Sequence, residues 1–219
     1  MHETAIDIIV AKNLHLEGVF TKPHTACRNF PAVVVCHPHP LLVGDMEHPL
    51  VTAICRVANR EKIGSLRFNF RGVGKSNGIF SNGDQEWKDV EAALNITKLM
   101  PGTDVKRLAL VGYSFGASTV LQGLPHYKET KCLVLISPSI TSVRNSRIME
   151  DKRPKMFIVG QSDGVVPSVD LQKFFDDTRH PDQFIEIAGA NHNFLARQTK
   201  EVAEHVIRFL LENLETHNI

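Results

Sequence analysis

The feature that most constrains this chain is a regular alternation between short apolar runs and longer stretches with helical periodicity. The runs LALVG, CLVLIS and MFIVG are apolar at nearly every position. Such strands are buried on both faces, which is typical of parallel sheets covered by crossover helices. Since crossovers of this kind are right-handed, the alternation predicts a mostly parallel, twisted α/β sheet of about eight strands with helices on both faces.

The expected elements can be placed along the sequence from this rhythm. The predicted strands are Thr4–Val10 and Leu14–Thr21, paired as an antiparallel hairpin, then Ala32–His37, Ser65–Phe70, Arg107–Gly112, Lys131–Ser137, Lys155–Gly160 and Gln183–Ile187. The predicted helices are His48–Lys62, Asp84–Met100, Gly116–Leu124, Ser168–Asp177 and Thr199–Leu214. No repeat or interdomain linker interrupts the 219 residues. We therefore expect one domain spanning residues 1–219.

Charge and composition exclude several classes of partner. The formal net charge is +1 and the Lys and Arg residues are scattered, so neither nucleic acid nor an anionic membrane is indicated. The N-terminal stretch is not a secretory signal and no apolar run is long enough to span a bilayer, so we expect a cytoplasmic protein. Cys27, Cys36, Cys55 and Cys132 form no Cys-x-x-Cys pair, and we expect no disulfides. The sequence does not indicate an oligomeric state.

The strongest chemical signal is Gly112-Tyr113-Ser114-Phe115-Gly116, which lies between a predicted strand and a predicted helix. This is the Gly-x-Ser-x-Gly pattern of a nucleophile elbow in the context that the elbow requires. The chain must turn sharply at the serine, so the neighbouring positions need glycine and the hydroxyl projects at the carboxyl edge of the sheet. The pattern predicts Ser114 as a catalytic nucleophile.

A serine nucleophile needs a base, and the base needs an acid that orients it. Asp163 follows the strand MFIVG, and His192 follows the strand FIEI, so both are predicted at the same sheet edge as Ser114. Asp176 and Asp177 also precede His192, but they lie within a predicted helix. We therefore expect Asp163 to be the acid and His192 to be the base.

With GYSFG, GQSDGVVP and GANHNF in the order Ser, Asp, His, the sequence resembles the α/β-hydrolase superfamily over nearly its whole length. The segment NFRGVGKSNG at residues 69–78 looks like the superfamily's loop after the fourth strand. The chain is most similar to small bacterial hydrolases with a His-Pro-His-Pro loop, and more distantly to dienelactone hydrolases, from which Ser114 departs because they carry cysteine there.

The resemblance implies a serine hydrolase that cleaves small soluble acyl substrates, either carboxylic esters or thioesters, through an acyl-enzyme intermediate. It implies no cofactor. Two other functions remain open: a serine peptidase or aminopeptidase-like hydrolase, and a protein of this fold that binds without turnover. The fold alone does not choose among ester, thioester and peptide substrates.

The histidine-rich loop after the first parallel strand could be read as a metal site. His37 and His39 are two residues apart, and Asp45 and His48 follow as further potential ligands. Zinc hydrolases with a His-x-His pair continue with a tight Asp-His, whereas five residues separate His39 from Asp45 here. We therefore predict no metal.

The resemblance implies a different role for this loop, because in the superfamily the matching loop supplies one N–H group of the oxyanion hole. The residue after the nucleophile, Phe115, supplies the other. Pro38 and Pro40 have no N–H group to donate. We therefore expect His39 to be the loop donor, with Leu41 as the less favoured alternative. Candidate pocket residues are His37, Leu41 and Tyr113, and the His37 and His39 side chains either brace the loop or line the pocket.

Two further features bear on function. Gly74-Lys75-Ser76 imitates the end of a phosphate-binding loop, but that motif requires glycine where this chain has Asn69, so nucleotide binding is not expected. The segment from Pro138 to Pro154, where the superfamily commonly inserts a lid, has room only for a loop or a short helix. The sequence therefore predicts an open site without a large cap, which prefers short-chain substrates.

Overall fold

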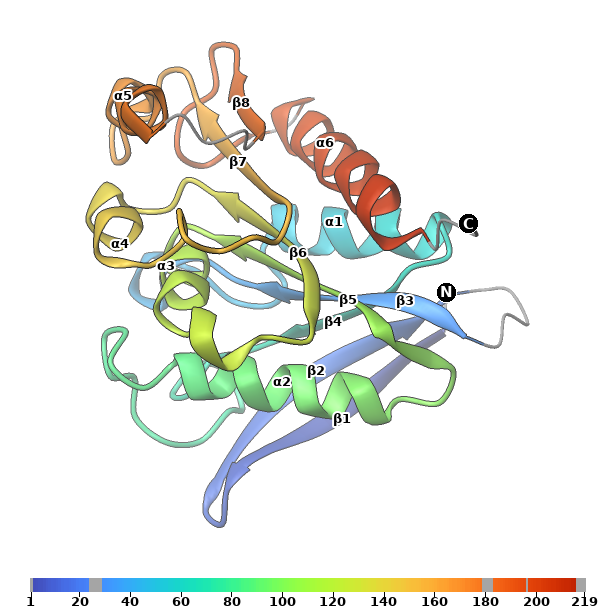
Figure 1. Ribbon diagram of the computed structural model, residues 1–219. Coiled ribbons are helices and arrows are strands. Elements are labelled where there is room, and N and C mark those ends of the chain that lie inside the picture. Colours follow the sequence, from blue (N-terminus) through green and yellow to red (C-terminus); the bar gives the residue numbers. More distant parts are fainter. Residues whose placement is uncertain (1, 24–28, 179–182, 196, 216–219) are drawn as a thin grey trace.

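A computed structural model describes residues 2–23, 29–178, 183–195 and 197–215. Within these residues the strands form one sheet, whose spatial order is β1 (His2–Ala11), β2 (Leu14–Lys22), β4 (Gly64–Phe68), β3 (Phe30–Cys36), β5 (Thr103–Tyr113), β6 (Thr130–Ile136), β7 (Lys155–Gly160) and β8 (Gln183–Ile187) (Figure 1). β1 pairs with β2, and β2 with β4, in antiparallel fashion, and the remaining pairs are parallel. The expected mostly parallel sheet with an N-terminal hairpin is confirmed.

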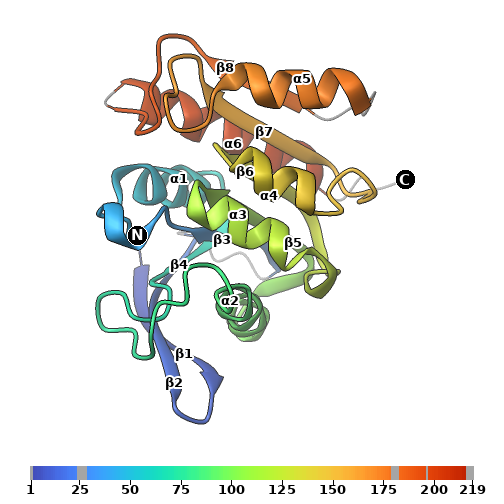
Figure 2. The same cartoon turned by 90° about the vertical axis from the view of Figure 1, so that its left-hand side faces the viewer.

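The helices cover both faces of the sheet. They are α1 (Pro49–Arg60), α2 (Trp87–Leu99), α3 (Phe115–Gln122), α4 (Ile140–Asn145), α5 (Ser168–Thr178) and α6 (Arg197–Leu214), with short 3-10 turns η1 (Pro40–Leu42) and η2 (Leu124–His126). α1 and α6 lie side by side on one face, and α2 to α5 contribute to the core on the other (Figures 1 and 2). α4 occupies the segment in which the sequence had room for only a loop or a short helix.

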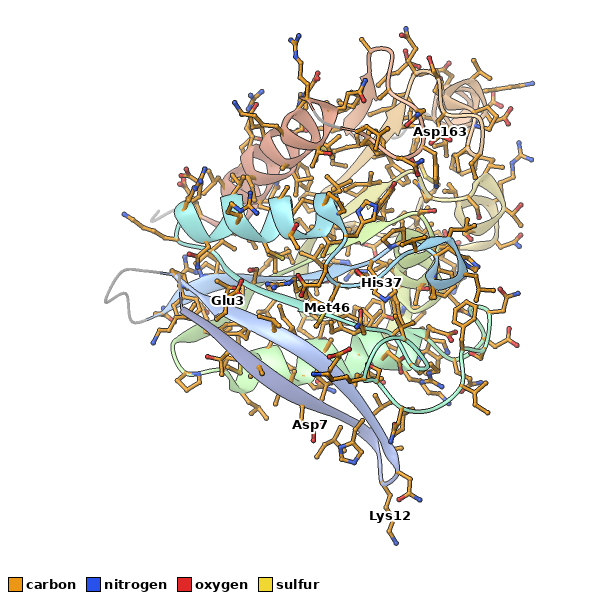
Figure 3. All side chains as sticks on the ribbon, turned by 180° about the vertical axis from the view of Figure 1, so that it is seen from behind. Glu3, Asp7, Lys12, His37, Met46 and Asp163 are labelled. Carbon is orange, nitrogen blue, oxygen red and sulfur yellow. The ribbon has the colours of Figure 1, made fainter. Side chains whose placement is uncertain are left out.

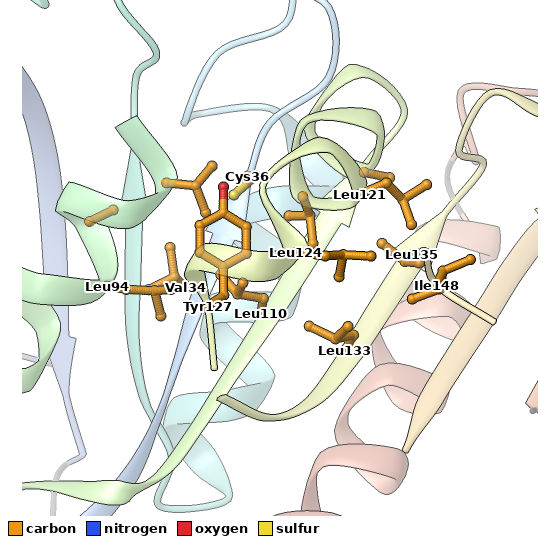
Figure 4. Close-up of a cluster of buried hydrophobic side chains, with 14 of the residues drawn as sticks. Val34, Cys36, Leu94, Leu110, Leu121, Leu124, Tyr127, Leu133, Leu135 and Ile148 are labelled. Carbon is orange, nitrogen blue, oxygen red and sulfur yellow. The ribbon is translucent and has the colours of Figure 1, made fainter. Parts of the chain in front are cut away.

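Alternation along each strand explains why the central strands are apolar throughout. Val34, Leu110 and Leu133 are aligned on neighbouring strands and belong to the cluster that packs against α2 and α3 (Figure 4). The residues one position earlier on β3 and β5, Val33 and Ala109, belong to the cluster that packs against α1 and α6. Because successive side chains point to opposite faces, a strand covered on both sides must be apolar at every position.

The cysteines serve packing. Cys36, Cys55 and Cys132 are free and buried, and burial raises the pKa of the Cys55 thiol to about 11. A thiol with so high a pKa is not ionised near neutral pH and is a poor nucleophile. Cys27 lies outside the described residues.

The parallel strands end at one edge of the sheet, and the loops that follow them meet there (Figure 2). Figure 3 shows His37, which follows β3, and Asp163, which follows β7, on the same side of the molecule, away from the β1–β2 hairpin that carries Lys12. Carboxyl edges of parallel strands are where α/β folds place their ligand sites. Among the described residues, no helix combines the length and apolar character needed to cross a membrane.

Candidate active site

Ser114 occupies a strained turn between β5 and α3. Its backbone angles are φ 53° and ψ −110°, a conformation that residues other than glycine rarely adopt. A Cβ atom at Gly112 would lie 2.5 Å from the Cα atom of Ala117, and one at Gly116 would lie 2.5 Å from the carbonyl oxygen of Cys36. Both glycines are therefore required for α3 to return so closely over the sheet edge, as the elbow pattern predicts.

Three side chains from three loops form a continuous hydrogen-bonded chain. Ser114 Oγ lies 2.9 Å from His192 Nε2. On the other side of the ring, His192 Nδ1 lies 2.8 Å from Asp163 Oδ2. The structure thus brings together the three residues that the sequence placed at the ends of β5, β7 and β8. Asp176, by contrast, accepts a hydrogen bond from Gln172 within α5.

Both oxygen atoms of the Asp163 carboxylate accept hydrogen bonds that fix its orientation. Its Oδ1 atom accepts hydrogen bonds from the backbone N–H groups of Val165 at 2.9 Å and Val166 at 2.8 Å. Its Oδ2 atom accepts from His192 and, at 2.9 Å, from the Ser137 hydroxyl. Burial alone would raise the pKa of the Asp163 carboxyl, but the bonds from His192, Val166 and Ser137 outweigh burial and lower it. Asp163 is therefore a fixed, ionised acceptor.

Tyr113 supports the loop that carries His192. It is 1% exposed, and its hydroxyl donates to the His192 carbonyl oxygen at 2.6 Å. Its ring packs edge-on against His48, with ring centroids 5.3 Å apart, and against Phe194 at 6.0 Å. Burial, with a smaller contribution from Asp163, raises the pKa of the Tyr113 hydroxyl, so it remains a donor. Tyr113 was expected as a pocket residue; the structure instead places it behind the histidine, because its ring points into the core.

His37 is a brace inside the loop after β3. It is fully buried, its Nδ1 atom lies 2.7 Å from the Pro38 carbonyl oxygen, and its Nε2 atom accepts the Phe70 N–H group at 3.1 Å. Burial lowers the pKa of His37 to about 4, so the ring is neutral near pH 7. Because both ring nitrogens form hydrogen bonds, the ring has no lone pair left for a metal. In the described part of the chain, no three or more His, Cys, Asp or Glu side chains lie close enough together to hold a metal ion.

The His39 loop lies directly against the elbow. The His39 ring packs edge-on against Phe80 and Phe115, with centroids 5.4 Å and 5.3 Å away. Its Nδ1 atom accepts a hydrogen bond from the Leu41 N–H group at 3.2 Å. The N–H group that was the alternative candidate for the oxyanion hole is therefore engaged within the loop. The Leu41 side chain itself is 76% exposed. A Cβ atom at Gly116 would lie 2.7 Å from the His37 carbonyl oxygen, so the loop and the first turn of α3 are in contact.

A solvent-open cavity of about 520 Å³ adjoins the elbow. Its walls are α3, beginning at Phe115, the segment around α4, and the loop at residues 82–84. Its size falls within the range of small-molecule sites. The segment Pro138–Pro154 therefore forms one wall of a pocket without closing over it.

Sequence reasoning missed Ser137 and the supporting role of Tyr113. Ser137 directly follows β6, at the same edge as the residues that were identified, so the rule that found Asp163 and His192 would also have found it. No sequence signal marks Tyr113 as the support of a loop 79 residues further along the chain. That contact depends on how β5 and β8 are placed in the sheet.

Known proteins resemble this chain along almost its full length. A protein from Rickettsia prowazekii is 28% identical over 214 residues, which cover 93% of this chain and 88% of that protein. An α/β serine hydrolase homologue from Coxiella burnetii superposes with a TM-score of 0.82 at 28% identity, covering 95% of this chain and 97% of that one. An α/β serine hydrolase without a lid from Xanthomonas campestris gives a TM-score of 0.84 at 23% identity, covering 99% and 97%.

Comparison with family models leads to the same group of proteins. The model of the dienelactone hydrolase family matches residues 76–215, a segment that includes Ser114, Asp163 and His192. The superpositions establish the α/β-hydrolase fold, with its eight-stranded, mostly parallel sheet. The chain belongs to the dienelactone hydrolase family of α/β hydrolases.

Proposed function

We propose that the chain is a single-domain serine esterase that hydrolyses small soluble carboxylic esters or thioesters. The observation that carries this proposal is the unbroken chain from Ser114 Oγ to His192 Nε2 at 2.9 Å and from His192 Nδ1 to Asp163 Oδ2 at 2.8 Å. A nucleophile, a base and an orienting acid in this arrangement are the machinery of acyl transfer.

The geometry supports a definite path for the proton. The Asp163 carboxylate accepts from His192 Nδ1–H, which leaves Nε2 as the acceptor for the Ser114 hydroxyl proton. Ser114 Oγ then attacks the carbonyl carbon, and the imidazolium returns the proton from Nε2 to the leaving oxygen or sulfur. A water molecule then attacks the acyl-enzyme carbonyl carbon while His192 Nε2 takes its proton. The bond to Ser114 Oγ breaks, His192 returns the proton to the serine, and the carboxylic acid is released.

Two backbone N–H groups are proposed to bind the oxyanion. Phe115 follows the nucleophile at the start of α3, where the helix dipole adds positive potential. In the β3 loop, the Leu41 N–H group is held by the ring of His39, and the prolines have no N–H, which favours the His39 N–H group as the second donor. The buried His37 ring ties this loop to Phe70 and keeps it rigid.

The open site favours small soluble substrates. The segment between β6 and β7 lies wholly within the described residues and contains the six-residue helix α4, so this segment forms no lid domain over Ser114. The homologue from Coxiella burnetii, at 28% identity, is described as a serine hydrolase, and that from Xanthomonas campestris as one without a lid. Both descriptions are consistent with this proposal.

Covalent labelling with a fluorophosphonate, together with p-nitrophenyl acetate hydrolysis, tests the proposed function. Wild type should be labelled once, and Ser114→Ala should lose both labelling and turnover. Ser168→Ala, at the start of α5, is the matched control and should retain both. An unlabelled wild type would indicate a protein that binds without turnover, and faster cleavage of aminoacyl amides than of esters would indicate a peptidase.

A further inference from the structure

The cavity beside Ser114 begins within one helical turn of the nucleophile. It is lined by Phe115 and Ser118 of α3, and Ser118 donates its backbone N–H to the Ser114 carbonyl oxygen at 3.0 Å. Residues four apart on a helix are stacked at a distance of roughly 5–6 Å. A substrate group attached to Ser114 Oγ can therefore extend along α3 into the cavity.

The cavity and His192 lie on opposite sides of the elbow. The loop that carries His192 is held by Tyr113, and Tyr113 and Phe194 belong to the core cluster under α1 and α6. Phe115, at the cavity, packs instead against the cluster under α2 and α3, and α3 and α4 lie side by side on this face (Figure 2). Because His192 must protonate the leaving group, the leaving group belongs on the α1 and α6 side. The acyl group then extends into the cavity.

Neutral polar residues form the largest group in the cavity lining, beside the apolar residues Phe115, Leu121, Leu124 and Pro125. Ser118 and Gln122 of α3 face Ser142 and Asn145 of α4, and Asn82 completes the lining from the loop before α2. The Ser142 hydroxyl already accepts a hydrogen bond from the Ser139 hydroxyl at 2.8 Å, so the groups left for a substrate are chiefly the side-chain amides of Asn82, Gln122 and Asn145. An apolar chain that displaced water from these amides would leave them unpaired. The lining therefore favours an acyl group that itself carries hydrogen-bonding substituents.

Charge on the lining disfavours an anionic acyl group. Arg147 forms an ion pair with Glu150 at 3.0 Å, and both side chains are exposed, so solvent weakens the attraction of Arg147 for an anion in the cavity. Asp84, on the opposite wall, has no ion-pair partner among the residues that the structure describes. A second carboxylate in the cavity would be repelled by Asp84 without a free cation to compensate.

One wall of the cavity is built in advance of any substrate. The buried Glu86 carboxylate accepts from the backbone N–H groups of Ser81 at 2.7 Å and Gly83 at 2.9 Å, and from the Ser81 hydroxyl at 2.7 Å. Between them, Asn82 is held at φ 56°. Asparagine tolerates this left-handed conformation, and the three hydrogen bonds to Glu86 fix the loop before a substrate binds, which lowers the cost of ordering it.

We propose that this cavity is the acyl pocket and that it selects short acyl groups bearing neutral hydrogen-bonding substituents, hydroxyls above all. The inference rests on the proposed esterase function of Ser114. It goes beyond that function by naming the side of the ester bond that is recognised and the chemistry that recognises it.

Three methyl esters of similar length test the proposal: methyl 6-hydroxyhexanoate, methyl heptanoate and monomethyl adipate. Wild type should show a kcat/KM for the hydroxy ester that is roughly 2- to 10-fold above that for heptanoate, as expected for one neutral hydrogen bond, and the lowest kcat/KM for the adipate anion. The double variant Gln122→Leu/Asn145→Leu should lose the preference for the hydroxyl. Gln172→Leu/Asn213→Leu, which makes the same change of amides on α5 and α6, should keep it.

Several outcomes would overturn the proposal. Heptanoate or adipate could be the best substrate of wild type, or the double cavity variant could retain the hydroxyl preference. A second pair, 2-hydroxyethyl and propyl hexanoate, places the hydroxyl on the alcohol, and a preference confined to this pair would assign the cavity to the leaving group. Hydrolysis of p-nitrophenyl acetate is the reference activity, and it should be equal in wild type and in Gln172→Leu/Asn213→Leu, whose substitutions lie outside the cavity. If wild type cleaves no ester at all, the proposed function fails, and this inference fails with it.

Discussion

Replacing Asp163 with asparagine tests the proposed mechanism most directly, because the surroundings of the carboxylate dictate how the amide must sit. Oδ1 accepts hydrogen bonds from the backbone N–H groups of Val165 and Val166. Because both partners are donors, only another acceptor atom can take its place. The amide oxygen must therefore occupy that position, which turns the NH₂ group toward His192 Nδ1. The histidine then accepts at Nδ1 and carries its proton on Nε2, where it cannot take the proton of Ser114.

The cost of escaping this arrangement sets the size of the effect. Flipping the amide would restore the productive tautomer but would point NH₂ at two backbone N–H groups and leave both donors unpaired, the one of Val166 in a buried position. At about 1–3 kcal/mol for each unpaired group, the productive state lies roughly 2–6 kcal/mol higher. Since about 1.36 kcal/mol is a factor of ten, kcat/KM should fall by roughly 1.5 to 4.5 powers of ten.

The assay is kcat/KM for p-nitrophenyl acetate, with folding checked by circular dichroism and thermal melting. Asp177→Asn is the matched control, because Asp177 is exposed on α5 and should retain wild-type turnover. A fall of less than fivefold for a folded Asp163→Asn variant would refute the tautomer argument. A larger fall for Asp177→Asn than for Asp163→Asn would assign the acid elsewhere.

Further predictions concern the other members of the site. Ser114→Ala and His192→Ala should each lower kcat by several orders of magnitude, and their effects should not add in the double variant. Single-turnover assays test this, and a double variant far slower than either single variant would argue against a shared step. His37, whose pKa is lowered to about 4, is neutral when folded but protonates near pH 6.5 when unfolded, so its contribution to stability is complete above pH 6.5 and is lost as pH falls toward 4. Urea denaturation at pH 7 and pH 5 should show a loss of stability that is about 2 kcal/mol smaller in His37→Gln than in wild type; the remaining loss includes that from His48, whose pKa burial also lowers. Across unsubstituted p-nitrophenyl esters, kcat/KM should fall with chain length, and a jump above the critical micelle concentration would reveal an unrecognised lid.

Patterns within short segments were sufficient to predict the elements and the edge at which the site lies. Continuous apolar runs require burial on both faces, which implied the parallel sheet. Gly112 and Gly116 marked the sharp turn at Ser114 because no larger residue fits there. Asp163 and His192 could be chosen because carboxyl ends of parallel strands share one edge, whichever strands are neighbours.

The roles of the supporting side chains were decided by the tertiary structure, because they depend on contacts between distant segments. Leu41 could be ranked below His39 as a donor, but only the loop geometry showed its N–H group held by the His39 ring. The sequence left open whether His37 lines the pocket or braces the loop, and its bond to Phe70, 33 residues away, shows a brace. Tyr113 was expected in the pocket, yet the packing of α1 and α6 turns its ring into the core. A sequence pattern reports which face a side chain takes on its own strand, whereas its partner is set by the element that packs against that face.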